Sequence, residues 1–264
     1  LRLADFRPEV PPIADFSTGL TMGQNAERLC KRLGITREQQ DAFAASSHHR
    51  AAQATKDGQL ARQIAPVRVP PRFEEIKEDN GIRADTSREK LARLRPAFDR
   101  RFGTITAGNS SYLTDGASAV LLMSERRARE RDVRPLARLV DFSLVAMDPL
   151  EELLLGPARA IPRVLERSRL TLAQMDVVEL HEAFAGQVLA VLKLLREEHV
   201  GEIDPARLNA WGGSLSVGHP FGATGGRLVM TCCHRLQREN GLYGLIAACA
   251  SGALGYAAVL ERLT

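Results

Sequence analysis

Three reactive side chains each stand next to a segment that is typical of a buried element. His181 follows the short apolar run 177–180, Cys249 follows the run 242–248, and His219 precedes a helix-like apolar segment. Ligands gather at the carboxyl ends of the strands in α/β sheets, so His181 and Cys249 stand where chemistry usually takes place. A cysteine there is a nucleophile or an acid/base group if its neighbours lower its pKa. Singly, each residue is better explained by packing, but the three together favour catalysis.

His219 lies in a glycine-rich stretch that runs from Gly212 to Gly226. Pro220 fixes its own φ and biases the histidine before it toward an extended conformation. Glycines let other backbone or a ligand approach closely, and the helix expected after the histidine has unpaired N–H groups at its start. A tight loop whose histidine only packs is the alternative, because satisfied structural histidines are common.

Zinc ligation is the competing functional interpretation of a Cys/His trio. The three residues are far apart in the sequence and no close ligand pair begins a site, so we expect no metal. The remaining cysteines, Cys30, Cys232 and Cys233, show neither disulfide nor zinc spacing, and the last two are typical of small core residues. This cysteine usage indicates a reducing compartment.

The composition indicates an ordinary globular protein with one basic region. Of 264 residues, 44% are hydrophobic and 26% charged, and this length forms one large or two modest domains. The net charge is +4, and the segment 56–101, with twelve basic and eight acidic residues, carries the whole excess. A localised basic surface suits an anionic ligand such as a phosphate group, whereas no motif indicates nucleic-acid binding. A solvated charged face is the alternative.

Helices that alternate with short apolar segments predict a layered α/β architecture. Thr36 and Gln39 have the spacing of a capping box. Helices are expected at 22–33, 36–56, 124–131, 157–167, 171–175 and 184–198, and from just after His219 to about 239. Strands are expected at 64–69, 104–108, 136–144, 177–180, 242–248 and 255–260. Residues 1–20 are expected to form an irregular arm, and 70–101 a loop-rich excursion.

Motifs in both halves of the chain resemble those of one known family, the thiolases. In the second half these are His181 to Ala185, Gly212 to Gly225 and Cys249 to Gly255. In the first half, the segments 22–27, 94–98 and 103–109 are similar to the family's middle section. The nearest resemblance is to the 3-ketoacyl-CoA thiolase subunits of fatty-acid β-oxidation trifunctional complexes, which have the His-Glu-Ala-Phe found at 181–184.

The resemblance implies the layered α/β/α/β/α thiolase fold. Residues 1–132 would then be the end of the N-terminal half-domain, with a CoA-binding loop domain at about 57–102, and residues 133–264 the complete C-terminal half-domain. It also implies an acyltransferase reaction in which CoA cleaves 3-ketoacyl-CoA to acetyl-CoA and a shortened acyl-CoA. CoA would be a substrate, with no covalently bound cofactor.

The resemblance also implies a role for each of the three reactive residues. His219 would activate the nucleophilic cysteine and donate to the thioester oxygen, and His181 would hold a water in the same oxyanion site. Cys249 would move protons to and from the acetyl carbon and the CoA sulfur, since an ordinary thiol pKa of about 8.5 is close to that of CoA itself. The backbone N–H of Ser251 would help to form a second oxyanion hole.

Four further residues match family positions that contact CoA: Met22, Arg83, Ser111 and Phe184. Arg83 lies in the basic excursion, which would give the localised charge a cause. The resemblance also implies a homodimer, the usual oligomeric state of the family, with a hydratase/dehydrogenase subunit as a further partner. They also imply a cytoplasmic location, or a mitochondrial one in a eukaryote.

The acylated cysteine of thiolases has no counterpart among the cysteines of this chain. Thiolases carry it in their N-terminal half, and Cys30, Cys232 and Cys233 stand in no motif that resembles its site. We therefore expect that the chain needs the missing half, leaves apolar faces exposed and has no turnover alone. A catalytically silent remnant that binds CoA or a partner subunit is one alternative. A ketoacyl synthase-type condensing enzyme is another, although such synthases lack a counterpart of Cys249.

Overall fold

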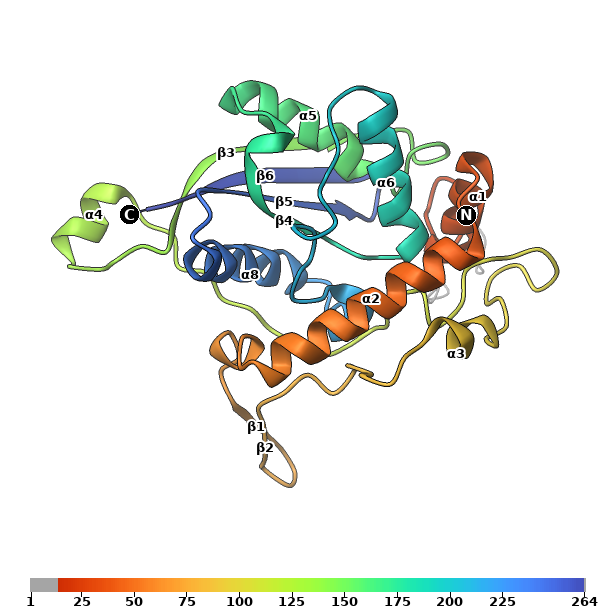
Figure 1. Ribbon diagram of the computed structural model, residues 1–264, viewed down its shortest axis with the longest axis horizontal. Helices are drawn as coiled ribbons and strands as arrows, with labels where there is room; N and C mark the ends of the chain where they lie inside the picture. Colours follow the sequence, from red (N-terminus) through yellow and green to blue (C-terminus); the bar gives the residue numbers. More distant parts are fainter. Residues whose placement is uncertain (1–13, 264) are drawn as a thin grey trace, which may run out of the picture.

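A four-stranded sheet organises the second half of the chain. The computed structural model describes residues 14–263, so most of the arm expected at 1–20 lies outside the described residues. The strands run in the order β3 (Ala137–Ala146), β6 (Leu254–Arg262), β5 (Tyr243–Ala250) and β4 (Met175–Leu180) (Figure 1). β4 and β5 are parallel, and the other pairs are antiparallel. The carboxyl ends of β4 and β5 therefore lie at the same edge.

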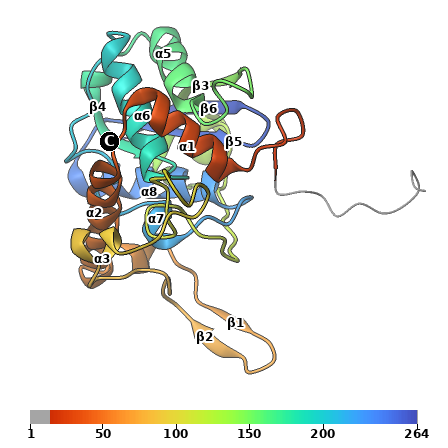
Figure 2. The same ribbon diagram turned by 90° about the vertical axis from the view of Figure 1, so that its right-hand side faces the viewer.

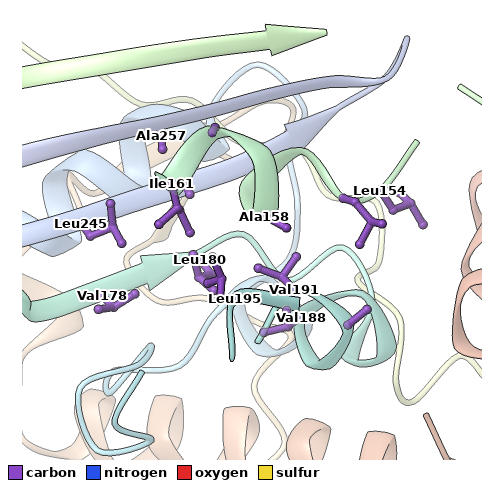
Figure 3. Packing of buried hydrophobic residues seen from close by; sticks show 14 of the residues in the cluster. Leu154, Ala158, Ile161, Val178, Leu180, Val188, Val191, Leu195, Leu245 and Ala257 are labelled. Carbon is purple, nitrogen blue, oxygen red and sulfur yellow. The ribbon is translucent and has the colours of Figure 1, made fainter. Parts of the chain in front are cut away.

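Helices cover both faces of this sheet because its strands are apolar on both sides. α5 (Gly156–Ser168) and α6 (Ala185–Glu197) pack on one face, where Val178, Leu245 and Val259 point (Figures 1 and 3). α8 (Thr224–Glu239) packs on the other face, where Val177 and Ile246 point. Cys232 and Cys233 of α8 are buried, as predicted.

Two capped helices begin the described part of the chain. α1 (Met22–Leu33) and α2 (Arg37–Lys56) each follow a threonine whose hydroxyl accepts an N–H three residues on, and the glutamine at that position returns the bond. The predicted bounds of both helices are confirmed. α1 packs on α6, and α2 crosses below the sheet domain beside α3 (Arg88–Ala92) and α7 (Ser214–Val217) (Figure 1).

The segment 57–102, expected to form a CoA-binding loop domain, carries a short β-ribbon that projects from the molecule (Figure 2). Its strands, β1 (Val67–Val69) and β2 (Glu74–Ile76), are antiparallel and exposed. The strand expected at 64–69 thus begins three residues later, and β2 was not predicted. The other expected elements appear as α4 (Glu125–Glu130) and the 3-10 turn η3 (Leu172–Gln174), while a further turn, η2 (Leu60–Arg62), follows α2.

The prediction of a strand at 104–108 is wrong, because the structure has no strand there. Ile105 is fully buried, but the N–H groups of Thr104 and Ile105 donate to the Glu27 carboxylate at 2.8 Å. Thr106 N–H donates to the Asn109 side chain. Side chains therefore satisfy the donors that a neighbouring strand would have taken.

Apolar side chains lie exposed along two segments of the structure. Leu121 and Leu122, in the run 117–123, are 79% and 77% exposed, and this run pairs with no strand among residues 14–263. Phe142 and Leu144 on β3 are also exposed. Contiguous apolar surface of this kind usually marks an interaction face.

Candidate active site

The rings of His181 and His219 pack against each other in a tilted arrangement at one edge of the sheet. Their ring centroids are 4.1 Å apart, with an angle of 38° between the planes. His181 directly follows β4, and its N–H continues the ladder to Ala247 O on β5. His219 N–H donates to Tyr112 O at 3.2 Å, which ties it to the first half of the chain. The fold thus brings these two histidines together, although they are 38 residues apart in the numbering.

The glycine-rich stretch reaches the histidines because two glycines allow very close contacts. A Cβ on Gly213 would lie 2.2 Å from Cδ of Glu182, so only glycine fits there. Gly218 has a φ of +91°, and a Cβ on it would lie 2.4 Å from the Thr114 side chain. The stretch forms the short helix α7 before His219. After the histidine, α8 begins at Thr224, which agrees with the helix expected there from the sequence.

Glu182 anchors this stretch, a role that the sequence analysis did not assign. Its carboxylate accepts hydrogen bonds from Asn209 Nδ2 at 2.7 Å, Ser47 Oγ at 2.8 Å and Leu215 N at 3.1 Å. Burial raises the pKa of Glu182, and the hydrogen bonds from Asn209, Ser47 and Leu215 oppose that rise. The only sequence signal was its place beside His181, since all three donors come from distant segments.

Cys249 lies on β5 at the same edge of the sheet as His181. The parallel register pairs Leu180 with Ala247, which puts His181 level with Ala248 and one residue short of Cys249. Burial raises the pKa of the Cys249 thiol to about 12. This direction differs from the near-ordinary thiol pKa that the resemblance implied, because burial disfavours the charged thiolate.

Ser251 lies exposed in the turn between β5 and β6. The positive φ values of this turn fall on Gly252, at +81°, and Ala253, at +57°. Ser251 itself is not in the left-handed conformation, so a side chain at this position is compatible with the turn.

Three of the four residues expected to contact CoA, Met22, Ser111 and Phe184, lie in segments that contact one another. Ser111 N–H donates to Ala183 O, and Phe184 follows directly as the N-cap of α6. Phe98 packs edge-to-face on Phe184 at 6.4 Å and also covers Gly23, next to Met22. Arg83 is exposed and lies against α2, where its N–H donates to His48 Nδ1 at 3.2 Å.

His48, which holds the Arg83 backbone, makes stability depend on pH. Burial, followed by the charges of Arg83 and His49, lowers its pKa to about 4. The unfolded chain therefore binds this proton more tightly, and stability is lost as pH falls from the unfolded value of about 6.5 toward 4. Between about pH 7.5 and pH 5.5 the loss is on the order of 1 kcal/mol.

We expect His48→Gln, which keeps an acceptor for Arg83 N–H, to flatten the pH dependence by about this amount. Urea unfolding at the two pH values measures it, with His199→Asn as a control at an exposed histidine. Equal pH slopes for parent and His48→Gln contradict the assignment.

Arg227 is a charged group beside the two histidines, and the sequence analysis did not assign it a role. Its Nη2 donates to Ser214 Oγ at 3.0 Å. Burial first, and then the Arg227 charge, lowers the pKa of His219 to about 4. The pKa of His181 falls well below its ordinary value through burial, His219 and Arg227. Both imidazoles are therefore neutral at pH 7. Nothing in the sequence around Arg227 indicated that its guanidinium turns inward.

Residues 14–263 contain neither a metal-ligand cluster nor a helix that could span a membrane. No three His, Cys, Asp or Glu side chains of this part converge as metal ligands. Within the same residues, no helix is both long and apolar enough to span a bilayer.

Two family models match the sequence in succession. Residues 8–126 match the thiolase N-terminal domain, and residues 133–262 match the thiolase C-terminal domain. The chain is 48% identical over 272 residues to the 3-ketoacyl-CoA thiolases of Shigella flexneri serotype 5b and Citrobacter koseri. These alignments cover 99% of this chain, which spans 62% of the length of each relative.

Solved structures share the fold at similar coverage. The Bacillus anthracis acetyl-CoA acetyltransferase superposes with a TM-score of 0.89 at 37% identity, over 98% of this chain and 66% of that one. Human mitochondrial 3-ketoacyl-CoA thiolase in complex with CoA gives 0.87 at 31% identity, over 99% and 67%. With these matches and the mixed α/β architecture, the chain has the thiolase fold and belongs to the thiolase family.

Proposed function

We propose that the chain is a catalytic portion of a 3-ketoacyl-CoA thiolase of fatty-acid β-oxidation. The observation that carries the proposal is the pair of neutral histidines, His181 and His219, packed together where the β4 edge meets the glycine-rich stretch. The 48%-identical relatives bear the name 3-ketoacyl-CoA thiolase, and one structural neighbour is a thiolase in complex with CoA.

In the proposed reaction, a cysteine thiolate attacks the C3 carbonyl carbon of 3-ketoacyl-CoA. The C2–C3 bond then breaks, its electron pair passes to the acetyl-CoA enolate, and C2 takes a proton. The thiolate of a second CoA next attacks the acyl-cysteine thioester and releases the shortened acyl-CoA with the free cysteine. Atoms balance, and no oxidant or reductant is needed.

The residues of this chain would supply proton transfer and oxyanion stabilisation. His219 takes the proton of the attacking cysteine, because its lowered pKa keeps it unprotonated at pH 7. His181 contributes a preorganised donor toward the thioester oxygen, directly or through a water. Cys249 delivers the proton to C2 as the protonated thiol, the form that its raised pKa favours. The resulting Cys249 thiolate then takes the thiol proton of the second CoA, which restores Cys249 and produces the attacking CoA thiolate.

CoA binding is proposed for Met22, Ser111 and Phe184, with Arg83 supplying positive charge. Arg83 is exposed in the basic segment, and its backbone N–H is bound by His48, so its side chain is free to meet a phosphate.

The half-domain boundary near 132, the homodimer and the hydratase/dehydrogenase partner stay predictions.

The acyl-accepting thiol is proposed to come from outside this chain. Burial raises the thiol pKa of Cys30 to about 12 and that of Cys233 to about 11, and it raises that of Cys232 well above the ordinary value. With Cys249 also raised, none of the four cysteines forms a thiolate readily at pH 7. The same observation favours a second candidate, a catalytically silent thiolase-fold chain that binds CoA without turnover.

We expect the purified chain to cleave no acetoacetyl-CoA and to carry no acyl group after incubation with it. Intact-mass spectrometry and a CoA-dependent cleavage assay measure the two outcomes on one sample, with the 48%-identical thiolase as the positive control. An acylated chain, or robust cleavage by the chain alone, contradicts the proposal that the nucleophile lies elsewhere.

A further inference from the structure

The two histidines bond through Nδ1 to two different hydroxyl groups. His181 Nδ1 lies 2.9 Å from Ser214 Oγ, and His219 Nδ1 lies 2.7 Å from Thr224 Oγ1. Ser214 and Thr224 are 0% and 3% exposed, so bulk water does not compete for either hydroxyl. The protonation of each ring therefore depends on what else each hydroxyl binds.

The other partner of the Thr224 hydroxyl is an acceptor. Pro220 O lies 3.2 Å from Thr224 Oγ1, one turn back along the chain, and a carbonyl oxygen can only accept the threonine hydrogen. With its hydrogen directed to Pro220 O, the hydroxyl offers His219 a lone pair, and the His219 nitrogen that faces it then carries the hydrogen of that bond. This leaves His219 protonated on Nδ1, with an unprotonated Nε2.

The other partner of the Ser214 hydroxyl is a donor. Arg227 Nη2 donates to Ser214 Oγ at 3.0 Å, and a guanidinium has no acceptor capacity. The Ser214 hydrogen is therefore directed to His181 Nδ1, which must accept it. This leaves His181 protonated on Nε2, the tautomer opposite to that of His219.

We infer that Ser214 and Thr224 hold the two histidines in opposite neutral tautomers, with Arg227 setting the direction of the Ser214 hydroxyl. The inference deepens the proposed function, on which it rests, because a base and an oxyanion donor need these opposite states. Ser214, Thr224 and Arg227 are positioning residues that act through the imidazoles. The positive charge of Arg227 also disfavours an imidazolium on either ring, which keeps both rings in neutral forms.

Histidine ring nitrogens labelled with ¹⁵N test the inference directly. Long-range proton–nitrogen correlation spectra at about pH 7 separate protonated from unprotonated ring nitrogens, and His181→Gln and His219→Gln each remove one assigned pattern. We expect the 264-residue chain to show protonated Nε2 at His181 and protonated Nδ1 at His219. The same tautomer on both rings overturns the inference, whatever the variants do.

Two substitutions then separate positioning from packing. We expect Ser214→Ala to shift the His181 pattern away from protonated Nε2 and to leave His219 unchanged, while Ser214→Thr keeps the parent pattern. Thr224→Val is expected to shift only His219. If folded variants, checked by circular dichroism, leave both patterns as in the parent, the hydroxyls do not set the tautomers. Because this readout needs no turnover, its failure is distinguishable from failure of the proposed thiolase reaction.

Discussion

His219→Gln is expected to lower kcat for acetoacetyl-CoA cleavage by about a thousandfold, within the range for losing a positioned general base. Cleavage is measured on the chain combined with the N-terminal portion of a 48%-identical relative, which carries the nucleophile in our account. The reason is local: Nε2 of His219 takes the cysteine proton, and glutamine has no basic nitrogen to replace it. KM is expected to change little, because His219 is not one of the proposed CoA contacts.

The pH profile separates this role from a merely structural one. Because burial and Arg227 lower the pKa of His219 to about 4, protonation of His219 should not limit the rate above about pH 5.5. His199→Asn, at an exposed histidine, is the matched control and should leave kcat unchanged. A His219→Gln enzyme that retains more than about a tenth of the parent kcat contradicts the assignment of the base.

Glu182→Ala is expected to destabilise the chain by about 3 kcal/mol or more. The substitution leaves the buried Leu215 N–H and one Asn209 N–H without their acceptor, while Ser47 Oγ keeps Ser216 Oγ at 3.1 Å as a partner. Each buried group left without a partner costs about 1–3 kcal/mol. Since Leu215 lies in α7, which directly precedes His219, we also expect the packing of His219 on His181 to weaken.

Urea unfolding followed by circular dichroism measures this change in the free energy of unfolding. Glu182→Gln keeps one acceptor oxygen but turns an amide N–H₂ toward the donors, so we expect an intermediate loss. Glu202→Ala, at an exposed glutamate, is the control and should stay within about 0.5 kcal/mol of the parent. If Glu182→Ala is no more destabilising than this control, Glu182 does not anchor the loop.

The sequence predicted best the features that depend on neighbouring residues. The bounds of α2 were correct because its capping box, at Thr36 and Gln39, is a local signal. The strand expected at 104–108 failed because Glu27, 77 residues away from Thr104, takes its backbone donors. No local pattern could indicate that contact.

The candidate site divides in the same way. His181 and His219 were recognisable because each stands where an apolar element begins or ends, and the structure packs them together. Glu182, Ser214 and Arg227 were not assigned, because their importance lies in contacts across the fold. The roles of Cys249, Ser251 and the CoA-binding residues stay predictions.

One complementation experiment tests the central claim, that this chain supplies the two histidines of a thiolase site but not its nucleophile. Acetoacetyl-CoA cleavage is measured for the chain alone, for the N-terminal portion of the 48%-identical relative alone, and for the two together. We predict turnover only in the mixture, and none there when the chain carries His219→Gln. Turnover by the chain alone, or a folded mixture that is inactive with the parent chain, contradicts the claim.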